Sequence, residues 1–289
     1  MIAPVSPRGF SVRVFLPEGD PAGVKVIEKS NWTGAGLVIP RALFARAKAR
    51  PELDRAGVYL LVGESERGPL PMVYLGEGDP VRPRLEQHGR AKDFWTHAVV
   101  FTSKDQGLNK AHVQRLEARL VELAHAAKRC VLDNGNVPQP PSLSEADTAE
   151  VEGFLDDVLL CLPTLGYFFF ERAAAESVAE SIGLLLRARG VEAHGAETPQ
   201  GFVVRVGSQA AKSETESCHA YLRDIRAELV GQEVLRDAGD HYELTQDYTF
   251  SSPSTAAGVV LGRAANGRTE WATAEGRTLK SIQNAAVAA

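Results

Sequence analysis

The chain has 289 residues and a formal net charge of -5, with 44% hydrophobic and 24% charged residues, which is ordinary for a globular protein of two or three domains. The net acidity argues against nucleic-acid binding over the whole surface, and the lack of an uninterrupted run of about 18 apolar residues argues against a membrane-spanning helix. Three cysteines far apart in the sequence, without a CxxC pair, argue against a structural disulfide or a thiolate zinc site.

Residues 1–52 predict a small N-terminal β-rich region. The first ten residues lack the basic and apolar segments of a signal peptide, so we expect a cytoplasmic protein without a membrane partner. Residues 10–16 and 24–29 alternate between apolar and polar side chains, as half-buried strands do. A turn cluster rich in Pro, Gly, Asp and Glu separates the two segments.

Residues 53–140 predict a compact domain that carries the chemistry. Segments 57–63 and 71–78 are apolar strands separated by a polar loop, which is typical of a β-hairpin. A third apolar strand is expected over residues 96–103.

Two helices complete this domain. We expect the first to run from residue 80 to residue 88, with Asp79 as its cap and Gly89 as its end. The second is expected over residues 109–129, where apolar side chains recur at helical spacing.

The remaining residues predict an acidic linker helix over 141–166 and a C-terminal α+β domain over 167–289. Within that domain we expect a helix around 175–189, a strand within 201–208 and a helix around 214–230. The chain as a whole is therefore predicted to be α+β.

Glu117 is the first candidate for a functional side chain. It lies on the apolar face of the predicted long helix, with Val113 four residues before it and Leu120 and Val121 after it. A buried carboxylate needs an ion-pair partner, a hydrogen bond or a metal ion, because burying a bare charge is costly. A glutamate at the edge of the apolar stripe that reaches solvent fits the same spacing, so periodicity alone leaves both alternatives open.

Arg84 and His88 are the second candidates, because a spacing of four residues places them on one face of a helix. Arginine offers a planar fork of donors that suits phosphate, and histidine can transfer a proton near neutral pH. Arg82, Arg90 and Lys92 add local positive charge, which makes them candidates for nucleic-acid binding. A solvated helix face without function is the simpler explanation of each residue alone.

The predicted strands add Tyr59, Tyr74 and His97. Strand tyrosines are usually half-buried packing residues, and an isolated strand histidine is more often structural than catalytic. None of these residues is specific by itself, and the specificity comes from their combined order along the chain.

The order of these elements resembles the GIY-YIG nuclease family between about residues 55 and 136. Two tripeptides stand where the family has its name-giving motifs, Gly57-Val58-Tyr59 and Tyr74-Leu75-Gly76, each with one apolar exchange. The other matches are polar side chains in the family order: Arg84, His88, His97, Glu117 and Asn134, or Asn136 in its place. The segments SNWTGAGLVIPR and SPSTAAGVVLGRAANGRTEW resemble the ends of a bacterial subgroup with a C-terminal domain of unknown function.

The resemblance implies a three-stranded antiparallel sheet flanked by helices, and a metal-dependent endonuclease that hydrolyses phosphodiester bonds in DNA. Glu117 would hold Mg²⁺ or Mn²⁺, because hard cations favour oxygen ligands. Tyr59 would be the general base, with its proton loss helped by the metal or by His88, and Tyr74 would orient phosphate or water.

By the same resemblance, Arg84 would bind the phosphate under attack, His97 would assist positioning and Asn134 would support the site from behind. Recruitment of DNA would fall to the basic residues of the first helix, Arg82, Arg90 and Lys92. The chain departs from the family in the segment GEGDPVRP after the second motif and in its net acidity, which puts substrate contacts in doubt. An RNA nuclease and a nucleic-acid-binding or regulatory protein with an inactive nuclease core are the alternatives.

Overall fold

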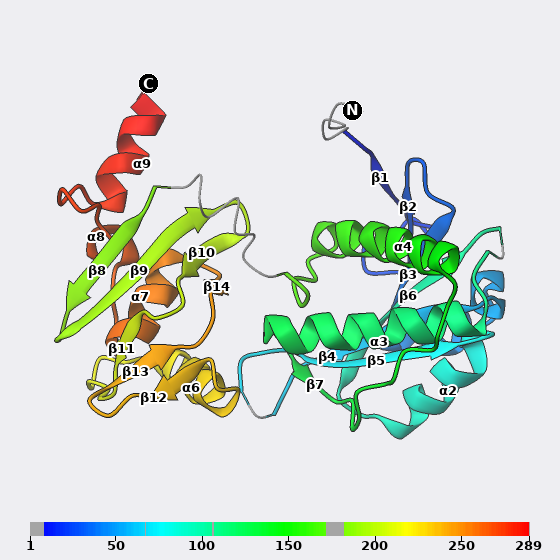
Figure 1. The fold of residues 1–289 in the computed structure, drawn as a ribbon. Coiled ribbons are helices and arrows are strands. Elements are labelled where there is room, and N and C mark those ends of the chain that lie inside the picture. Colours follow the sequence, from blue (N-terminus) through cyan, green and yellow to red (C-terminus); the bar gives the residue numbers. More distant parts are fainter. Residues whose placement is uncertain (1–8, 67, 106, 172–181, 289) are drawn as a thin grey trace. The chain divides into compact units, whose positions relative to one another are not determined.

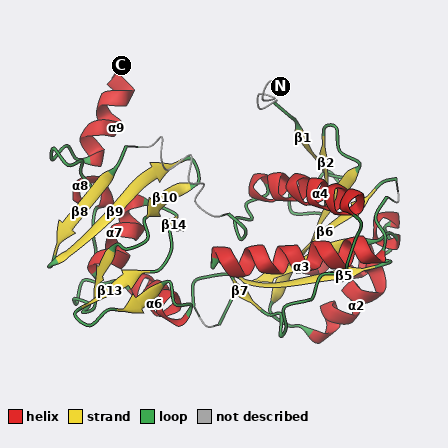
Figure 2. Cartoon of the chain, in the orientation of Figure 1, coloured by secondary structure: helices red, strands yellow, loops and turns green. Residues whose placement is uncertain are grey.

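A computed structural model of the chain describes residues 9–66, 68–105, 107–171 and 182–288. The chain divides into two compact units (Figure 1). The first comprises residues 1–65 and 71–170, and the second comprises residues 66–70 and 171–289. Both units combine helices and strands, so the predicted α+β class is confirmed at this level (Figure 2).

The first unit is built on a seven-stranded mixed sheet with the strand order β1-β2-β3-β6-β4-β5-β7. Neighbouring strands are antiparallel except for β5 and β7, which are parallel. The strands are β1 (Val12–Phe15), β2 (Lys25–Lys29), β3 (Gly34–Pro40), β4 (Gly57–Gly63), β5 (Met72–Gly78), β6 (Trp95–Ser103) and β7 (Val131–Leu132).

The predicted hairpin and third strand correspond to β4, β5 and β6, which are adjacent in the sheet. The sheet is nevertheless wider than the expected three strands, because the N-terminal strands belong to it. Strand β3 pairs with β6 along its whole length, from Gly34 opposite Ser103 to Pro40 opposite His97. Since most of β6 is buried, its second edge needs a partner for its backbone groups, and β3 supplies that partner.

Helices cover both faces of this sheet. Alternate side chains of β4 point to opposite faces, so Val58 and Leu60 pack with α3 and α4, whereas Tyr59 and Leu61 pack with α2. The helices are α1 (Phe44–Ala47), α2 (Val81–Ala91), α3 (Lys110–Ala127) and α4 (Glu145–Thr164), with 3₁₀ turns at Arg41–Leu43 and Pro51–Asp54.

Helix α2 differs from its prediction at both ends. Its first N–H, that of Val81, donates to the carbonyl oxygen of Arg55 at 2.9 Å, and the Asp79 side chain forms no cap. Gly89 lies inside the helix, because the Trp95 indole packs against it and donates from Nε1 to its carbonyl oxygen at 3.2 Å. The predicted helix end at Gly89 is therefore wrong, because this glycine allows close packing against Trp95.

Helix α3 follows its prediction closely, and α4 does not act as a linker. The Asn109 side chain caps α3 by accepting hydrogen bonds from the N–H groups of Ala111 and His112 at 2.9 and 3.1 Å. The expected linker region 141–166 instead buries the apolar face of α4 in the core of the first unit. Burial of such a face is a dominant favourable term in folding, which explains this docking.

The second unit contains two antiparallel sheets with strand orders β14-β10-β9-β8 and β11-β13-β12. The strands are β8 (Leu184–Ala188), β9 (Val191–Thr198), β10 (Gly201–Val204), β11 (Gln209–Ala211), β12 (Leu235–Asp237), β13 (His241–Leu244) and β14 (Tyr248–Phe250). The helices are α6 (Ala220–Gly231), α7 (Pro253–Leu261), α8 (Gly267–Glu270) and α9 (Leu279–Ala288).

The helix expected around residues 175–189 is wrong where the chain can be described. Residues 172–181 lie outside the described residues, and residues 184–188 form strand β8. Arg189 and Gly190 have φ angles of 56° and 77°, which makes a two-residue turn into β9. Leu184 and Leu186 are buried and Leu185 is half-buried, an alternation that a run of three leucines does not reveal in the sequence.

Within the described ranges, no helix combines the length and the apolarity that crossing a membrane requires.

Candidate active site

Two tyrosines and a histidine meet on the α2 face of the sheet. Tyr59 on β4 and Tyr74 on β5 have ring centroids 6.2 Å apart, and the Tyr59 hydroxyl lies 2.6 Å from Nδ1 of His88 on α2. The Tyr74 ring meets the His88 ring edge to face at 4.8 Å. Gly76 stands opposite Tyr59, and a Cβ there would lie 2.4 Å from the Tyr59 ring, so this glycine makes room for the tyrosine.

These three side chains are uncharged at neutral pH. Burial raises the pKa of Tyr59 far above its ordinary value, and it also raises the pKa of Tyr74, with the Glu117 charge as the next cause. Burial lowers the pKa of His88, and the positive charges of Arg84 and Lys92 add to that effect. The cluster is therefore two phenols around a neutral imidazole.

Glu117 on α3 is a carboxylate without a compensating cation. Burial raises its pKa from 4.5 to about 7, with the charge of Glu77 as the next cause, while Arg84 and Lys110 act in the opposite direction. Within the described ranges, no cation lies at ion-pair distance from Glu117, whereas Glu77 is paired with Lys110. Glu117 is therefore the group at this site that lacks a positive partner.

Arg84 is exposed on α2, and its Nη1 donates to Oε1 of Gln87 at 3.1 Å. Its charge lowers the pKa of Tyr59, Tyr74 and Glu117, which places the guanidinium close to all three. A guanidinium bonded to a neutral amide keeps its charge available for an anion.

Asn134 supports the site from behind. Its Oδ1 accepts from the N–H of Leu75 at 2.9 Å, and its Nδ2 donates to the carbonyl oxygen of Leu75 at 2.8 Å. The side chain thus continues the pairing that β7 begins and satisfies the backbone of β5 beside Tyr74. Asn136, the alternative match, is exposed in the same loop.

The predicted nucleic-acid-binding residues are less free than the sequence suggested. Arg82 pairs with Asp54 at 2.6 Å, and Lys92 pairs with Asp133 at 2.6 Å. Lys92 also lies 4.0 Å above the Tyr74 ring. Arg90 is exposed and pairs with Glu86 at the longer distance of 3.4 Å. Of the three cations, Arg90 has the most exposed side chain and the longest ion pair.

His97 is not brought to this cluster. Its neighbours on β6 alternate, with Ala98 packed on the Tyr59 face and Val99 on the α3 face, so His97 points to the face opposite Tyr59. Its Nδ1 lies 3.1 Å from the Thr96 hydroxyl, and burial lowers its pKa, with the charge of Lys25 on β2 as the next cause. We assign no functional role to His97.

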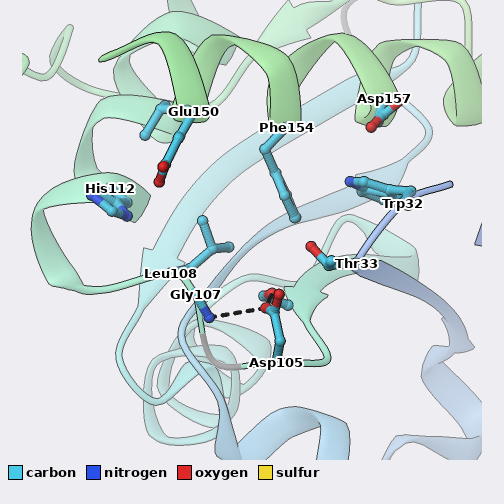
Figure 3. Close-up of a pocket in the computed structure, with 11 residues that line it drawn as sticks. Trp32, Thr33, Asp105, Gly107, Leu108, His112, Glu150, Phe154 and Asp157 are labelled. Atoms are coloured by element: carbon cyan, nitrogen blue, oxygen red, sulfur yellow. Dashed lines mark hydrogen bonds between the residues drawn. The ribbon is translucent and has the colours of Figure 1, made fainter. Parts of the chain in front are cut away.

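A cavity of about 340 Å³ lies on the α4 side of the first unit, apart from the tyrosine cluster (Figure 3). The rings of Trp32 and Phe154 line it, with centroids 5.1 Å apart, and His112, Glu150 and Asp157 supply polar walls. Asp105 accepts from the Gly107 N–H at 3.0 Å at its floor. None of the predicted site residues lines this cavity.

Residues 184–283 match the family model described as a domain of unknown function (DUF4357). No curated protein and no solved structure matches the chain, and no nuclease family model matches it. The DUF4357 domain begins at β8 and reaches into α9, so it makes up most of the second unit. All the candidate site residues named above precede the DUF4357 domain in the chain.

The side chains around Glu117 offer a hard divalent cation carboxylate oxygens but no cluster of three or more protein ligands. No group of three or more His, Cys, Asp or Glu side chains with metal-binding geometry occurs within the described ranges. The carboxylates are the half-buried Glu117 and Glu77, whose charge acts on it. Mg²⁺ often takes one or two protein carboxylates and fills its other positions with water and phosphate oxygens. The residues present are therefore compatible with such an ion.

Proposed function

We propose that the chain is a metal-dependent endonuclease that hydrolyses phosphodiester bonds in DNA. The observation that carries the proposal is the contact of two neutral phenols with a neutral imidazole on the α2 face of the sheet, beside the exposed guanidinium of Arg84. Glu117 projects from α3, the helix on the other face, and its charge acts on the pKa of both tyrosines. Phosphodiester hydrolysis needs an activated water, charge neutralisation at the phosphate and stabilisation of the leaving oxygen. This group of side chains contains a candidate for each need.

The tyrosines and His88 suit a proton relay. The Tyr59 hydroxyl lies 2.6 Å from Nδ1 of His88, the Tyr59 and Tyr74 rings are neighbours, and Tyr74 is the partly exposed one of the two tyrosines. As water attacks phosphorus, its proton would pass to the Tyr74 hydroxyl, the Tyr74 proton to Tyr59 and the Tyr59 proton to Nδ1 of His88. Both phenols end this step neutral, which matters because burial disfavours a phenolate.

The relay changes the expected roles of the two tyrosines. We expected Tyr59 to act on water directly and Tyr74 to orient it. The Tyr59 side chain is fully buried, which favours an inner position between Tyr74 and His88. The partly exposed Tyr74 is then the residue that meets water.

Glu117 would hold Mg²⁺ or Mn²⁺, and such an ion would neutralise phosphate and leaving-group oxygens. Arg84 would hold a non-bridging oxygen of the scissile phosphate through paired N–H donors, which a planar guanidinium provides. Asn134 would keep the β5 edge, and with it Tyr74, in place.

The proposal is tested by cleavage of labelled DNA and RNA, in Mg²⁺ and in excess chelator. We compare the wild type with Glu117→Gln and use Glu122→Gln as a matched control, because Glu122 lies on the same helix with its side chain 64% exposed and paired with Arg119. The wild type and the control should cleave DNA in Mg²⁺, and Glu117→Gln should lose about a hundredfold or more in rate.

Turnover in excess chelator, or a wild-type rate for Glu117→Gln, would contradict the proposal. Cleavage of RNA alone would identify an RNA nuclease. Tight binding of nucleic acid without cleavage of either kind would identify a binding protein with an inactive core.

A further inference from the structure

Glu77, the residue directly after the second motif, is a carboxylate that the proposed mechanism does not use. Glu77 is the sixth residue of β5, and its side chain is only 11% exposed. Strand alternation places it on the same face as Val73 and Leu75, which pack toward α3. Its two oxygens accept from Lys110 Nζ at 2.5 and 2.7 Å. A carboxylate is thus held inward, against the first turn of α3.

The charges of Glu77 and Lys110 both act on the Glu117 carboxyl. Lys110 and Glu117 are seven residues apart on α3, about two helical turns, so both project from one side of the helix. After burial, the charge of Glu77 is the largest influence on the Glu117 carboxyl, and Lys110 acts on the same carboxyl in the opposite sense. The Lys110 ammonium therefore pairs with Glu77 and acts on Glu117 only through its charge.

We propose that Glu77 is a second carboxylate ligand of the divalent cation, and that the Lys110 ammonium takes up part of that cation site until the metal binds. The inference rests on the proposed metal-dependent function. A divalent ion would satisfy both carboxylates, and hard cations in phosphoryl chemistry commonly use one or two carboxylates. The Lys110 side chain is 52% exposed, so its ammonium can move into solvent or toward a substrate phosphate when it leaves Glu77.

The test is calorimetric titration of the full chain with Mn²⁺ in the absence of nucleic acid, with circular dichroism as a check on folding. Glu77→Gln should weaken Mn²⁺ binding about tenfold or more, because a ligand is lost. Lys110→Met should strengthen it severalfold, because the competing ammonium is gone. Glu122→Gln removes an exposed carboxylate from the same helix and should bind Mn²⁺ as the wild type does.

The double variant Glu77→Gln/Lys110→Met separates ligation from long-range electrostatics. It removes one negative and one positive charge, so the net charge near Glu117 is unchanged. A lost ligand keeps the double variant about tenfold weaker than the wild type, whereas a purely electrostatic effect cancels and restores wild-type affinity. Wild-type affinity in the double variant would overturn the inference.

The failure of this inference can be told apart from the failure of the proposed function. If Glu117→Gln loses Mn²⁺ binding while both Glu77 variants keep it, Glu77 is not a ligand and the metal site at Glu117 stands. If the wild type shows no Mn²⁺ binding, or Glu117→Gln binds as the wild type does, the metal-dependent function itself is contradicted.

Discussion

Replacement of Glu117 by glutamine should stabilise the first unit while it removes the proposed metal site. A pKa raised from 4.5 to about 7 means that the folded state disfavours the charged carboxylate, with a limit of about 3 kcal/mol at high pH. Because the side chain still reaches solvent, we expect about 1–2 kcal/mol. The wild type would then keep the Glu117 carboxylate for its function at a cost in stability, as is common at active sites.

The sign of the pH dependence follows from proton binding. Between pH 4.5 and about 7 the folded chain holds the Glu117 proton more tightly than the unfolded chain does, so this group makes the wild type less stable as pH rises. The advantage of Glu117→Gln should therefore be near zero at pH 4.5 and complete above pH 7.

Denaturant unfolding at pH 4.5, 7 and 8.5 measures this difference. Two units break two-state behaviour, so the signal must come from the first unit alone. Of the three tryptophans, Trp271 lies in the second unit, and a Trp271→Phe background leaves Trp32 and Trp95 as reporters. A stability difference that does not grow between pH 4.5 and pH 7, or a Glu117→Gln chain less stable than wild type at pH 8.5, would refute the reasoning.

Three further predictions concern the same site. Arg84→Lys should lower single-turnover cleavage nearly as much as Arg84→Ala, because lysine lacks the planar fork; an active Arg84→Lys chain would mean that charge alone suffices. Asn134→Ala removes both hydrogen bonds to Leu75 and should cost about 1–3 kcal/mol in denaturant unfolding, and an unchanged midpoint would show that water replaces the amide. Mg²⁺ affinity measured by calorimetry should rise about tenfold from pH 6 to pH 8, as a Glu117 carboxyl with a pKa of about 7 loses its proton; equal affinities would rule out Glu117 as the titrating ligand.

Local pattern was sufficient for the parts of the fold that depend on near neighbours. The hairpin of β4 and β5 and the helix α3 were predictable because apolar side chains recur at strand or helix spacing over their whole length. The shared face of Arg84 and His88 follows from the helical repeat alone. The contact between Tyr59 and His88 needs, in addition, the strand register that sets Gly76 opposite Tyr59.

The rest depends on contacts between distant segments, which a single sequence does not display. The pairing of β3 with β6 joins residues about sixty apart, and α4 docks through apolar side chains that pack with those of α3 and the sheet. Glu77 is visible in the sequence directly after the second motif, yet its pairing with Lys110 follows from how α3 packs on β5. Strand β8 was mistaken for a helix because a short apolar run fits both periods.

The pairing of β3 with β6 also bears on where the chain can be cut. A chain that began at Leu53 would keep every candidate site residue, yet it would leave one whole edge of the largely buried, nine-residue strand β6 without a partner. An open, apolar strand edge is a template for pairing between molecules. Shortening at the N-terminus would therefore reveal itself first as self-association and precipitation, long before any change in the chemistry of the site.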